Sequence, residues 1–445
     1  MKKKNLLSSW KEIALYLDCD IRTCLRWEKK YGLPIHRIDQ KSRARVYAFI
    51  DELDQWLDKG LRKNLKNKYI LTLKKIWSKF HYFILLSLCI GALIILFFLL
   101  LKKNNSTPAN FKIENTNLII LDPMEKELWR FDTGLDKLVA ERDYRDHFQF
   151  KKRLDSIEDF LPQLIIKDIN QNGMKEVLFS TQTQDELNEG KIFCFNHNGI
   201  LLWDYKTGRE LKFGQKVYSP DYRIHGFDTC DLDDDGNHEI IVISMQLTYF
   251  PTQLTVLDHK GRILGEYWNS GQIKNYVFED LDNDGKKEII LSAMNNEYKK
   301  GCLIVFDSAN IRGSSPQLNN YYKCRDLEEG SEIFYILIPR TDVGLMNEIY
   351  DVLPRVDILA NHRISTMSGI CLINFEFNYE LELLDIRLSH TFERLHNKLL
   401  LEGKIKSELN REEYRKKLSQ GILYFDGKKW ISQRAVSNPL RSLGN

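Results

Sequence analysis

The sequence predicts a multidomain protein: a small α+β head, a single transmembrane helix and a larger all-β body. Three observations support this fold class. The chain of 445 residues is long enough for about three units. An apolar run without a charged residue occupies 82–101. After that run, strand-like segments recur together with similar acidic loops, which indicates internal repetition.

Charge differs sharply between the two ends of the chain. Residues 1–81 hold 20 Lys and Arg against 9 Asp and Glu, whereas 82–445 hold 45 against 53. A basic head suits a polyanionic partner. The eight cysteines contain no CxxC pattern, so a zinc site is not indicated, and a role as small buried apolar side chains is favoured.

The head begins with two predicted helices. Ser9 and Glu12 have the spacing of a capping box, and apolar residues recur behind them at helical spacing. Asp20 can cap a second helix. The sequence "GLP" then predicts that this helix ends at Gly32. Two short helices joined by a tight turn predict a helix-turn-helix, although the usual turn glycine is missing.

Two short strands around a basic turn and a helix at 51–57 are predicted next, which together make a winged helix-turn-helix domain over 1–58. The stretch "IRTCLRWEKKYGLPIHR" followed by "RVYAF" resembles the excisionase and MerR type of module. The resemblance implies DNA binding. Arginines of the second helix can read guanine edges, and the wing suits phosphates. The expected DNA-contacting residues are Arg22, Thr23, Arg26, His36, Arg37, Lys41, Arg43 and Arg45. A protein-binding use of the same module is the alternative.

The apolar run 82–101, "YFILLSLCIGALIILFFLLL", predicts one membrane span, because about 20 residues of helix cross the hydrocarbon core. A basic juxtamembrane linker, 59–81, precedes it and suits anionic lipid headgroups. A short linker, 102–110, follows with fewer basic residues. The positive-inside rule therefore places the head in the cytoplasm and the body outside a bacterial inner membrane.

The body carries three acidic loops with the pattern D-x-[DN]-x-[DN]-G-x-x-E, each followed by an apolar run. Oxygen atoms on alternate positions of a tight loop can surround Ca²⁺. These are not EF-hands, because the acid stands at position 9 and strands flank the loop. The candidate ligands are Asp168, Asn170, Asn172 and Glu176 in loop 1, Asp231, Asp233, Asp235 and Glu239 in loop 2, and Asp280, Asp282, Asp284 and Glu288 in loop 3. Loop 1 is the weakest candidate, because asparagines replace two aspartates.

These loops and the strand-turn-strand repeats that end at Gly134, Gly208 and Gly271 resemble the FG-GAP or VCBS repeats of integrin-α-like β-propellers. The resemblance implies an all-β propeller over 111–445 with six or seven blades and structural Ca²⁺. Trp129, Trp203 and Trp268 are expected to pack between blades. A helical stretch near His390–Gln420 is expected as an insertion, and Gly421–Trp430 is expected to close the ring.

The combined features predict a membrane-tethered transcription regulator whose propeller senses an extracytoplasmic ligand or protein. Its expected partners are DNA and the membrane, with homodimerisation open. The alternative is a membrane-anchored adhesion or scaffold protein whose propeller binds a protein or glycan and whose head is a protein-interaction module. The sequence contains no nucleophile elbow, HExxH or phosphate loop, so no catalytic residue and no enzyme are predicted; a quinoprotein-like enzyme is the weakest alternative.

Overall fold

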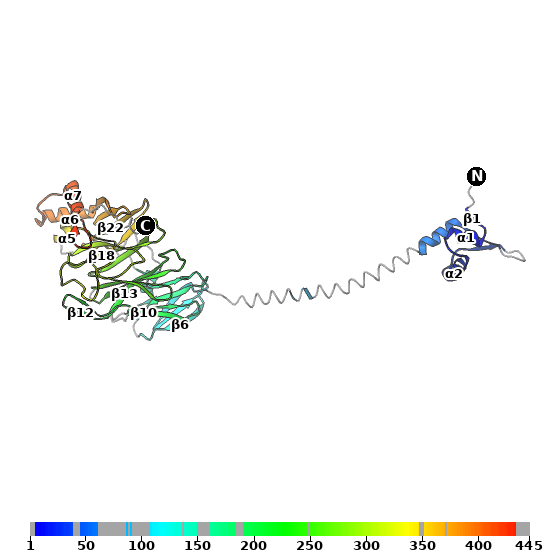
Figure 1. Ribbon diagram of the computed structural model, residues 1–445, viewed down its shortest axis with the longest axis horizontal. Coiled ribbons are helices and arrows are strands. Elements are labelled where there is room, and N and C mark those ends of the chain that lie inside the picture. The colour runs from blue at the N-terminus through cyan, green and yellow to red at the C-terminus, as the bar shows by residue number, and fades with distance from the viewer. Residues whose placement is uncertain are drawn as a thin grey trace. The chain divides into compact units, whose positions relative to one another are not determined.

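The protein is described by a computed structural model and divides into two compact units, Met1–Asn105 and Ser106–Asn445 (Figure 1). The described residues are 5–38, 45–60, 86–87, 90, 107–135, 138–148, 161–183, 190–247, 250–346, 351–369 and 372–432. None of the helices within these ranges is long and apolar enough to cross a membrane. The predicted span 82–101 lies almost entirely outside the described residues.

The two predicted helices of the head are α1 (Trp10–Tyr16) and α2 (Ile21–Tyr31). Ser9 caps α1 by accepting a hydrogen bond from the Glu12 amide, and Asp20 caps α2 through the Thr23 amide, as the capping patterns predict. Gly32 ends α2 in the left-handed conformation at φ 62°. Asp18 adopts φ 51° between the helices, so an aspartate replaces the expected turn glycine.

A three-stranded sheet completes the head together with the helical residues 50–60. Its strands are β1 (Leu6–Leu7), β2 (His36–Ile38) and β3 (Arg45–Phe49), in the order β1-β3-β2. The sequence pattern missed β1, because two residues are too few to show an alternation. Buried side chains from both helices, β3 and residues 50–60 meet in one small core, which holds Ile13, Ala14, Cys24, Leu33, Ala48 and Leu53.

The described residues of the body form five antiparallel sheets of three or more strands, which follow one another in chain order. The first sheet has β4 (Asn110–Glu114), β5 (Asn117–Leu121) and β6 (Glu127–Asp132). The second has β7 (Leu164–Lys167), β8 (Glu176–Ser180), β9 (Lys191–Phe195) and β10 (Leu201–Lys206). The third has β13 (Tyr222–Cys230), β14 (Glu239–Gln246), β15 (Thr252–Leu257) and β16 (Ile263–Asn269).

The fourth sheet begins with β17 (Ile273–Glu279), β18 (Glu288–Asn295), β19 (Lys300–Phe306) and β20 (Phe334–Leu337). The hairpin strands β25 (Leu423–Phe425) and β26 (Trp430–Ile431) extend it to six strands. The fifth sheet has β21 (Val356–Leu359), β22 (Arg363–Ser368), β23 (Ile373–Phe377) and β24 (Leu383–Leu388).

Smaller features accompany these sheets. One is a two-stranded hairpin of β11 (Leu211–Phe213) and β12 (Lys216–Tyr218). The others are the helices α4 (Glu141–Phe148), α5 (Asp342–Met346), α6 (His390–Leu401) and α7 (Arg411–Gly421). Helices α6 and α7 confirm the helical insertion that the sequence predicts.

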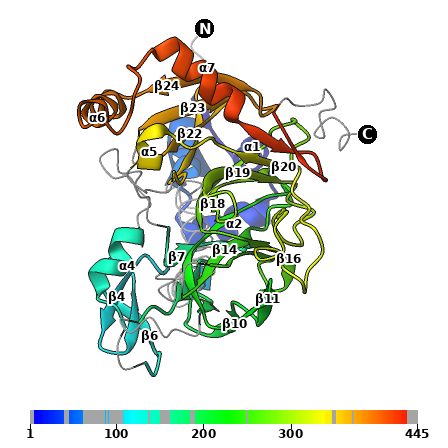
Figure 2. The same ribbon diagram turned by 90° about the vertical axis from the view of Figure 1, so that its left-hand side faces the viewer.

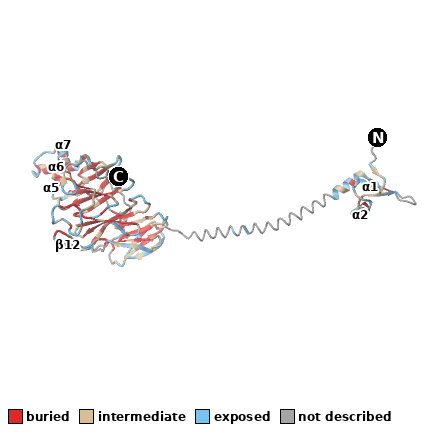
Figure 3. Cartoon of the chain, viewed as in Figure 1, coloured by how far each residue is buried: buried red, intermediate tan, exposed pale blue. Residues whose placement is uncertain are grey.

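The five sheets stack in series, each packing on the next. In Figure 2 they follow one another along an arc in chain order. The strand after each acidic loop is buried on both faces. Adjacent residues of that strand therefore pack alternately against the preceding sheet and the following sheet. Ile240 packs toward the second sheet and Ile241 toward the fourth, while Ile289 and Ile290 divide in the same way. Figure 3 shows the resulting buried strands. The body is therefore propeller-like.

Trp129 and Trp203 join neighbouring sheets, as expected, whereas Trp268 packs in a separate cluster with Tyr222 of its own sheet and Phe213 of the β11–β12 hairpin. Trp129 of the first sheet donates its indole N–H to the His197 carbonyl at 3.1 Å, in the β9–β10 turn. Trp203 of the second sheet makes the equivalent 3.0 Å bond to His259 in the β15–β16 turn. A glycine in each turn lies directly against the tryptophan ring. The repeated strand pairs are thus joined by a repeated contact.

The expectation of six or seven blades needs correction, because the described residues form five large sheets. Two segments account for the difference. The chain between β19 and β20 forms no strand of its own. The segment expected to close the ring instead adds β25 beside β20, with Tyr424 opposite Ile336.

Candidate metal centres and the basic face of the head

Each of the three acidic loops joins the first two strands of a sheet. Loop 1 connects β7 to β8, loop 2 connects β13 to β14, and loop 3 connects β17 to β18. Their glycines have φ between 83° and 90°, a conformation that side chains disfavour. In every loop the glycine amide donates to the aspartate at position 1, so the loop curls around that carboxylate.

Loop 2 brings three carboxylates together. One oxygen each of Asp231, Asp233 and Glu239 lies within 4.8 Å of the others. Glu239 is buried and accepts the Leu232 amide at 2.9 Å. Asp231 Oδ1 is buried and accepts no hydrogen bond within the described structure. A cation would satisfy that oxygen and relieve the repulsion among the three groups.

Loop 3 repeats this arrangement with Asp280, Asp282 and Glu288. Glu288 accepts the Leu281 amide at 2.7 Å. Burial, and then the neighbouring aspartates, raise the pKa of Glu288 to about 7, and burial with Asp233 and Asp235 does the same for the pKa of Glu239. Both loops therefore hold a concentrated negative charge at a partly buried point.

The fourth predicted ligand lies outside each cluster. Asp235 and Asp284 are exposed, and each accepts the backbone amide two residues further on at 2.7 Å. These aspartates form Asx turns. The structure thus brings together three of the four predicted ligands in loops 2 and 3.

Loop 1 differs chemically, although its backbone hydrogen bonds match those of the other loops. The Asn170 side-chain amide donates to Glu176 at 3.1 Å, where an aspartate occupies the same position in loops 2 and 3. Asn172 accepts the Met174 amide at 2.8 Å. In loop 1 the uncharged Asn170 amide therefore donates to Glu176 at the position where loops 2 and 3 carry a second negative charge. Asp168 and Glu176 are the remaining carboxylates of the loop.

The loops are linked in register across neighbouring sheets. The amide of His238 in loop 2 donates to the Ile169 carbonyl in loop 1 at 2.8 Å. The amide of Lys287 in loop 3 donates to the Leu232 carbonyl in loop 2, also at 2.8 Å. In both cases position 8 of one loop contacts position 2 of the preceding loop. A change in one loop therefore acts on backbone that its neighbour shares.

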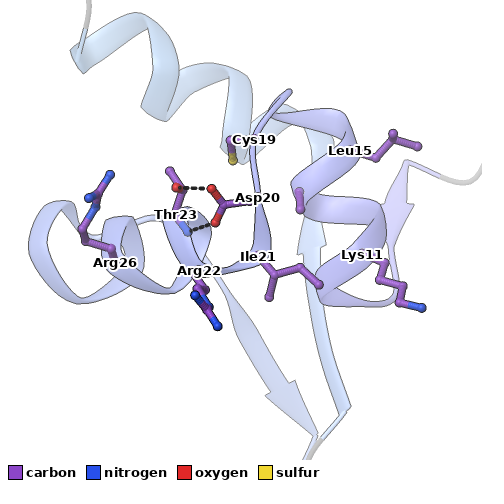
Figure 4. A pocket seen from close by; sticks show the side chains of 9 residues that line it. Lys11, Leu15, Cys19, Asp20, Ile21, Arg22, Thr23 and Arg26 are labelled. Atoms are coloured by element: carbon purple, nitrogen blue, oxygen red, sulfur yellow. Dashed lines mark hydrogen bonds between the residues drawn. The ribbon is translucent and has the colours of Figure 1, made fainter.

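In the head, α2 exposes a row of basic side chains. Arg22 and Arg26 stand one helical turn apart and are both exposed. Neither guanidinium forms an ion pair with the described residues. They line a shallow groove of about 900 Å³ between α1 and α2, together with Lys11, Cys19 and Asp20 (Figure 4). This surface presents two arginines that form no salt bridge with the described residues.

Other residues predicted to contact DNA are engaged within the head. The Thr23 hydroxyl donates to Asp20 at 3.0 Å as part of the helix cap. His36 Nε2 lies 2.7 Å from Glu52, and Arg37 pairs with Glu28 at 2.7 Å. Arg45 is exposed on β3. Lys41 and Arg43 lie outside the described residues. Sequence spacing cannot show such pairings, because they join different elements.

Sequence reasoning also missed a cavity of about 1010 Å³ in the body. The segment between β19 and β20 and the β25–β26 hairpin form its walls. Burial raises the pKa of Glu332, in this wall, to about 8. Glu332 Oε2 and Gln317 Oε1 are buried there without a hydrogen bond to any described residue. Polar groups of this kind are commonly satisfied by a ligand or by water.

Comparison with known proteins finds no matching protein-family model and no matching curated sequence. Among solved structures, the Dos1 propeller is similar at 9% identity, with a TM-score of 0.33, over 62% of this chain and 65% of that one. The chain therefore spans slightly less than two thirds of that structure. A likeness at this level assigns no function.

Two further similar structures are enzymes. An exo-β-1,3-galactanase from Phanerochaete chrysosporium matches at 10% identity and TM-score 0.25, over 64% of this chain and 63% of that one. A Synechocystis apocarotenoid oxygenase matches at 10% identity and TM-score 0.23, over 64% of this chain and 59% of that one. The prediction that the chain is not an enzyme is contradicted by these matches. It relied on missing sequence motifs, and catalytic groups can be assembled from distant positions that no motif records.

Proposed function

We propose that this protein is a membrane-tethered, DNA-binding transcription regulator with an extracytoplasmic calcium-binding sensor body. The observation that carries the proposal is the exposed pair Arg22 and Arg26 on a capped helix after a tight turn. In a winged helix-turn-helix, the second helix enters the major groove and its arginines contact base edges.

The geometry of the head supports this role. Asp20 holds the first turn of α2 through two hydrogen bonds from Thr23, so Arg22 projects from an ordered helix start. The β2–β3 hairpin places exposed Arg45 beside this unit, where a wing contacts phosphates. Pairing of Arg37 with Glu28 fixes the hairpin against α2 and removes Arg37 from the proposed DNA contacts.

The membrane assignment rests on the apolar run 82–101 and the basic residues before it. The proposed location is the bacterial inner membrane, with the head in the cytoplasm and the body outside. The body would sense a ligand or a protein partner. The cavity beside Glu332 is of a size that suits a small molecule, which supports that role. Homodimerisation would match the two-fold symmetry of many DNA sites.

Calcium is proposed as a structural cofactor of loops 2 and 3. The clusters Asp231, Asp233, Glu239 and Asp280, Asp282, Glu288 present hard oxygen ligands, as Ca²⁺ prefers. Loop 1 is left out of this proposal, because Asn170 replaces one of the three carboxylates and its side-chain amide donates a hydrogen bond to Glu176. Calcium sites of extracellular modules bind at ~10⁻⁴–10⁻³ M and would fill outside the cell.

The test is DNA capture by the full chain from sheared genomic DNA, followed by affinity measurements on the enriched duplex and on random DNA. Arg26→Ala should weaken binding to the enriched duplex by roughly 1–3 kcal/mol and change binding to random DNA much less. The matched variant Arg45→Ala should weaken binding to both duplexes alike and reduce the salt dependence.

Equal losses on both duplexes for Arg26→Ala would remove base reading from the proposal. If the full chain enriched no DNA, the head would instead be a protein-interaction module, as expected for an adhesion or scaffold protein.

A further inference from the structure

Two cysteine sulfur atoms meet at the turn that positions α2. Cys19 lies in the turn between the helices and Cys24 in the first turns of α2, and their Sγ atoms are 3.2 Å apart. Both are free thiols. A disulfide has an S–S length of about 2.05 Å, so the sulfurs need to approach by only about 1.2 Å. We propose that Cys19 and Cys24 form a reversible disulfide that controls the DNA-binding helix.

The two thiols differ in access in the way that such a pair requires. Cys19 is partly exposed and lines the groove between α1 and α2, where a small reagent can reach it (Figure 4). Cys24 is fully buried in the core of the head. Burial, and then the contact with Cys19, raise the pKa of the Cys24 thiol. Cys19 is therefore the attacking thiol and Cys24 the resolving thiol.

The exchange needs an external low-molecular-weight disulfide as oxidant. The Cys19 thiolate attacks one sulfur of this reagent, forms a mixed disulfide and releases one thiol. The Cys24 sulfur, after losing its proton, then attacks Cys19, forms the Cys19–Cys24 bond and releases the second thiol. The protein loses two electrons and two protons, which the reagent gains as two thiols.

The bond acts on DNA binding through the helix cap. Cys19 and Cys24 flank Asp20, whose carboxylate accepts the amide and the hydroxyl of Thr23. Drawing the sulfurs together moves the turn against α2 and shifts this cap, next to Arg22. Base contacts depend on bidentate geometry, so oxidation should weaken specific binding. This regulatory step rests on the proposed function, whereas disulfide formation does not.

The first experiment counts thiols in the full chain. The protein, in detergent, is treated with oxidised glutathione or with a reductant, desalted, denatured and labelled with a mass-adding maleimide. The reduced chain should label at eight cysteines and the oxidised chain at six. Cys19→Ser should label at seven after either treatment. The matched control Cys194→Ser, in the body, should label at seven cysteines after the reductant and at five after oxidised glutathione.

Equal labelling of the wild-type chain in both buffers would overturn the proposal. A loss of two thiols in Cys19→Ser would assign the disulfide to other cysteines and overturn it equally. Peptide mapping of the oxidised chain supplies an independent readout, since the bond should link the peptides that carry Cys19 and Cys24.

The second experiment measures binding of both forms to the enriched duplex. Oxidation should weaken binding about tenfold, comparable to losing one good base contact, and a reductant should restore it. Cys19→Ser should bind equally in both buffers. Unchanged affinity in a chain that forms the disulfide would overturn the regulatory step. If neither form binds DNA while the thiols are lost, the proposed function fails and the disulfide stands.

Discussion

Asn170, Asp233 and Asp282 hold the same position in the three acidic loops, but only the two aspartates carry charge. Asn170 donates a hydrogen bond to Glu176, while Asp233 and Asp282 approach a buried glutamate with like charge. Like charges at this distance raise the cost of the ion-free state. A single functional group therefore separates a loop that contains an internal hydrogen bond from two loops whose carboxylates repel one another.

This difference predicts the response of the body to calcium. Residues 106–445 should melt at higher temperature in millimolar calcium than in chelator, because binding to the folded state adds about 2 kcal/mol per site at a twentyfold excess over the dissociation constant. The double variant Asp233→Asn and Asp282→Asn should show little calcium effect and should be the more stable protein in chelator. The matched variant Asn172→Ala, in loop 1, should keep the full calcium effect. Identical wild-type melting curves in the two buffers would leave the loops as turns without an ion.

The same clusters set a pH dependence for the calcium effect. The pKa values of Glu239 and Glu288 are raised to about 7 in the ion-free fold, first by burial. Because the folded-state pKa is raised, protonation of these glutamates stabilises the fold, and this stabilisation is fully present at a pH below their ordinary pKa of about 4.5. It is lost as the pH rises through the folded-state value of about 7. The melting difference between calcium and chelator should therefore be small at pH 5 and large at pH 8.

For single residues, the sequence predicts the chemistry of a side chain better than it predicts which other residues that side chain contacts. Positions 1, 3 and 9 of loops 2 and 3 do converge, because the loop pattern is local. Asp235 and Asp284 do not, and each instead accepts a hydrogen bond from the backbone amide two residues further on. His36 and Arg37 were assigned to DNA, yet acids from other elements hold them. Such pairings depend on tertiary structure and leave no spacing to detect.

Elements of the body are joined by one repeated contact, in which a tryptophan lies against a turn glycine of the next sheet. A Cβ atom built on Gly199 would stand 2.6 Å from the Trp129 ring, with φ at +80°. Gly173 has nearly the same conformation, φ +83°, but nothing lies within 4 Å of its Cβ position. A comparison of substitutions at the two glycines therefore separates the cost of backbone strain from the cost of overpacking.

Gly199→Ala should destabilise the body more than Gly173→Ala. Both substitutions cost about 1–2 kcal/mol for the left-handed conformation, and only the first adds an overpacking cost of about 1–3 kcal/mol. Urea denaturation of residues 106–445 measures the difference. Combining Gly199→Ala with Trp129→Leu should remove the extra cost of the alanine. Equal destabilisation by the two single variants would mean that the Trp129 contact does not join the sheets.

Strands and helices were predictable where a local pattern defines them. The caps Ser9 and Asp20, the strands on both sides of each loop and the helical insertion all follow from short-range signals. The number of sheets was not predictable from the sequence, because it depends on which strands pair with one another. β25 pairs with β20 across 85 intervening residues, and no local signal distinguishes that choice from the start of a new sheet.

For the whole molecule, the proposal unites a unit that suits DNA with a unit that suits calcium. Cytoplasmic calcium would leave sites of ~10⁻⁴–10⁻³ M empty, and the chromosomal DNA that a regulator binds lies in the cytoplasm. A chain that uses both must have its two units, Met1–Asn105 and Ser106–Asn445, in different compartments. In the proposed topology, the apolar run 82–101 and its flanking charges would keep the two units apart.

The topology is therefore a prediction of its own. A reporter enzyme that is active only in the cytoplasm should be active when fused after Gly60 and inactive when fused after Asn445. A reporter that is active only outside should behave in the opposite way, which controls for poor expression of either fusion. Replacing the basic residues of 59–79 with glutamine should weaken this orientation, because the positive-inside rule is the basis on which the head is assigned to the cytoplasm. Cytoplasmic activity of the Asn445 fusion would place both units in one compartment. The calcium loops would then have to work at cytoplasmic calcium concentrations, where sites of this affinity are empty, and the sensing role of the body would lose its physical basis.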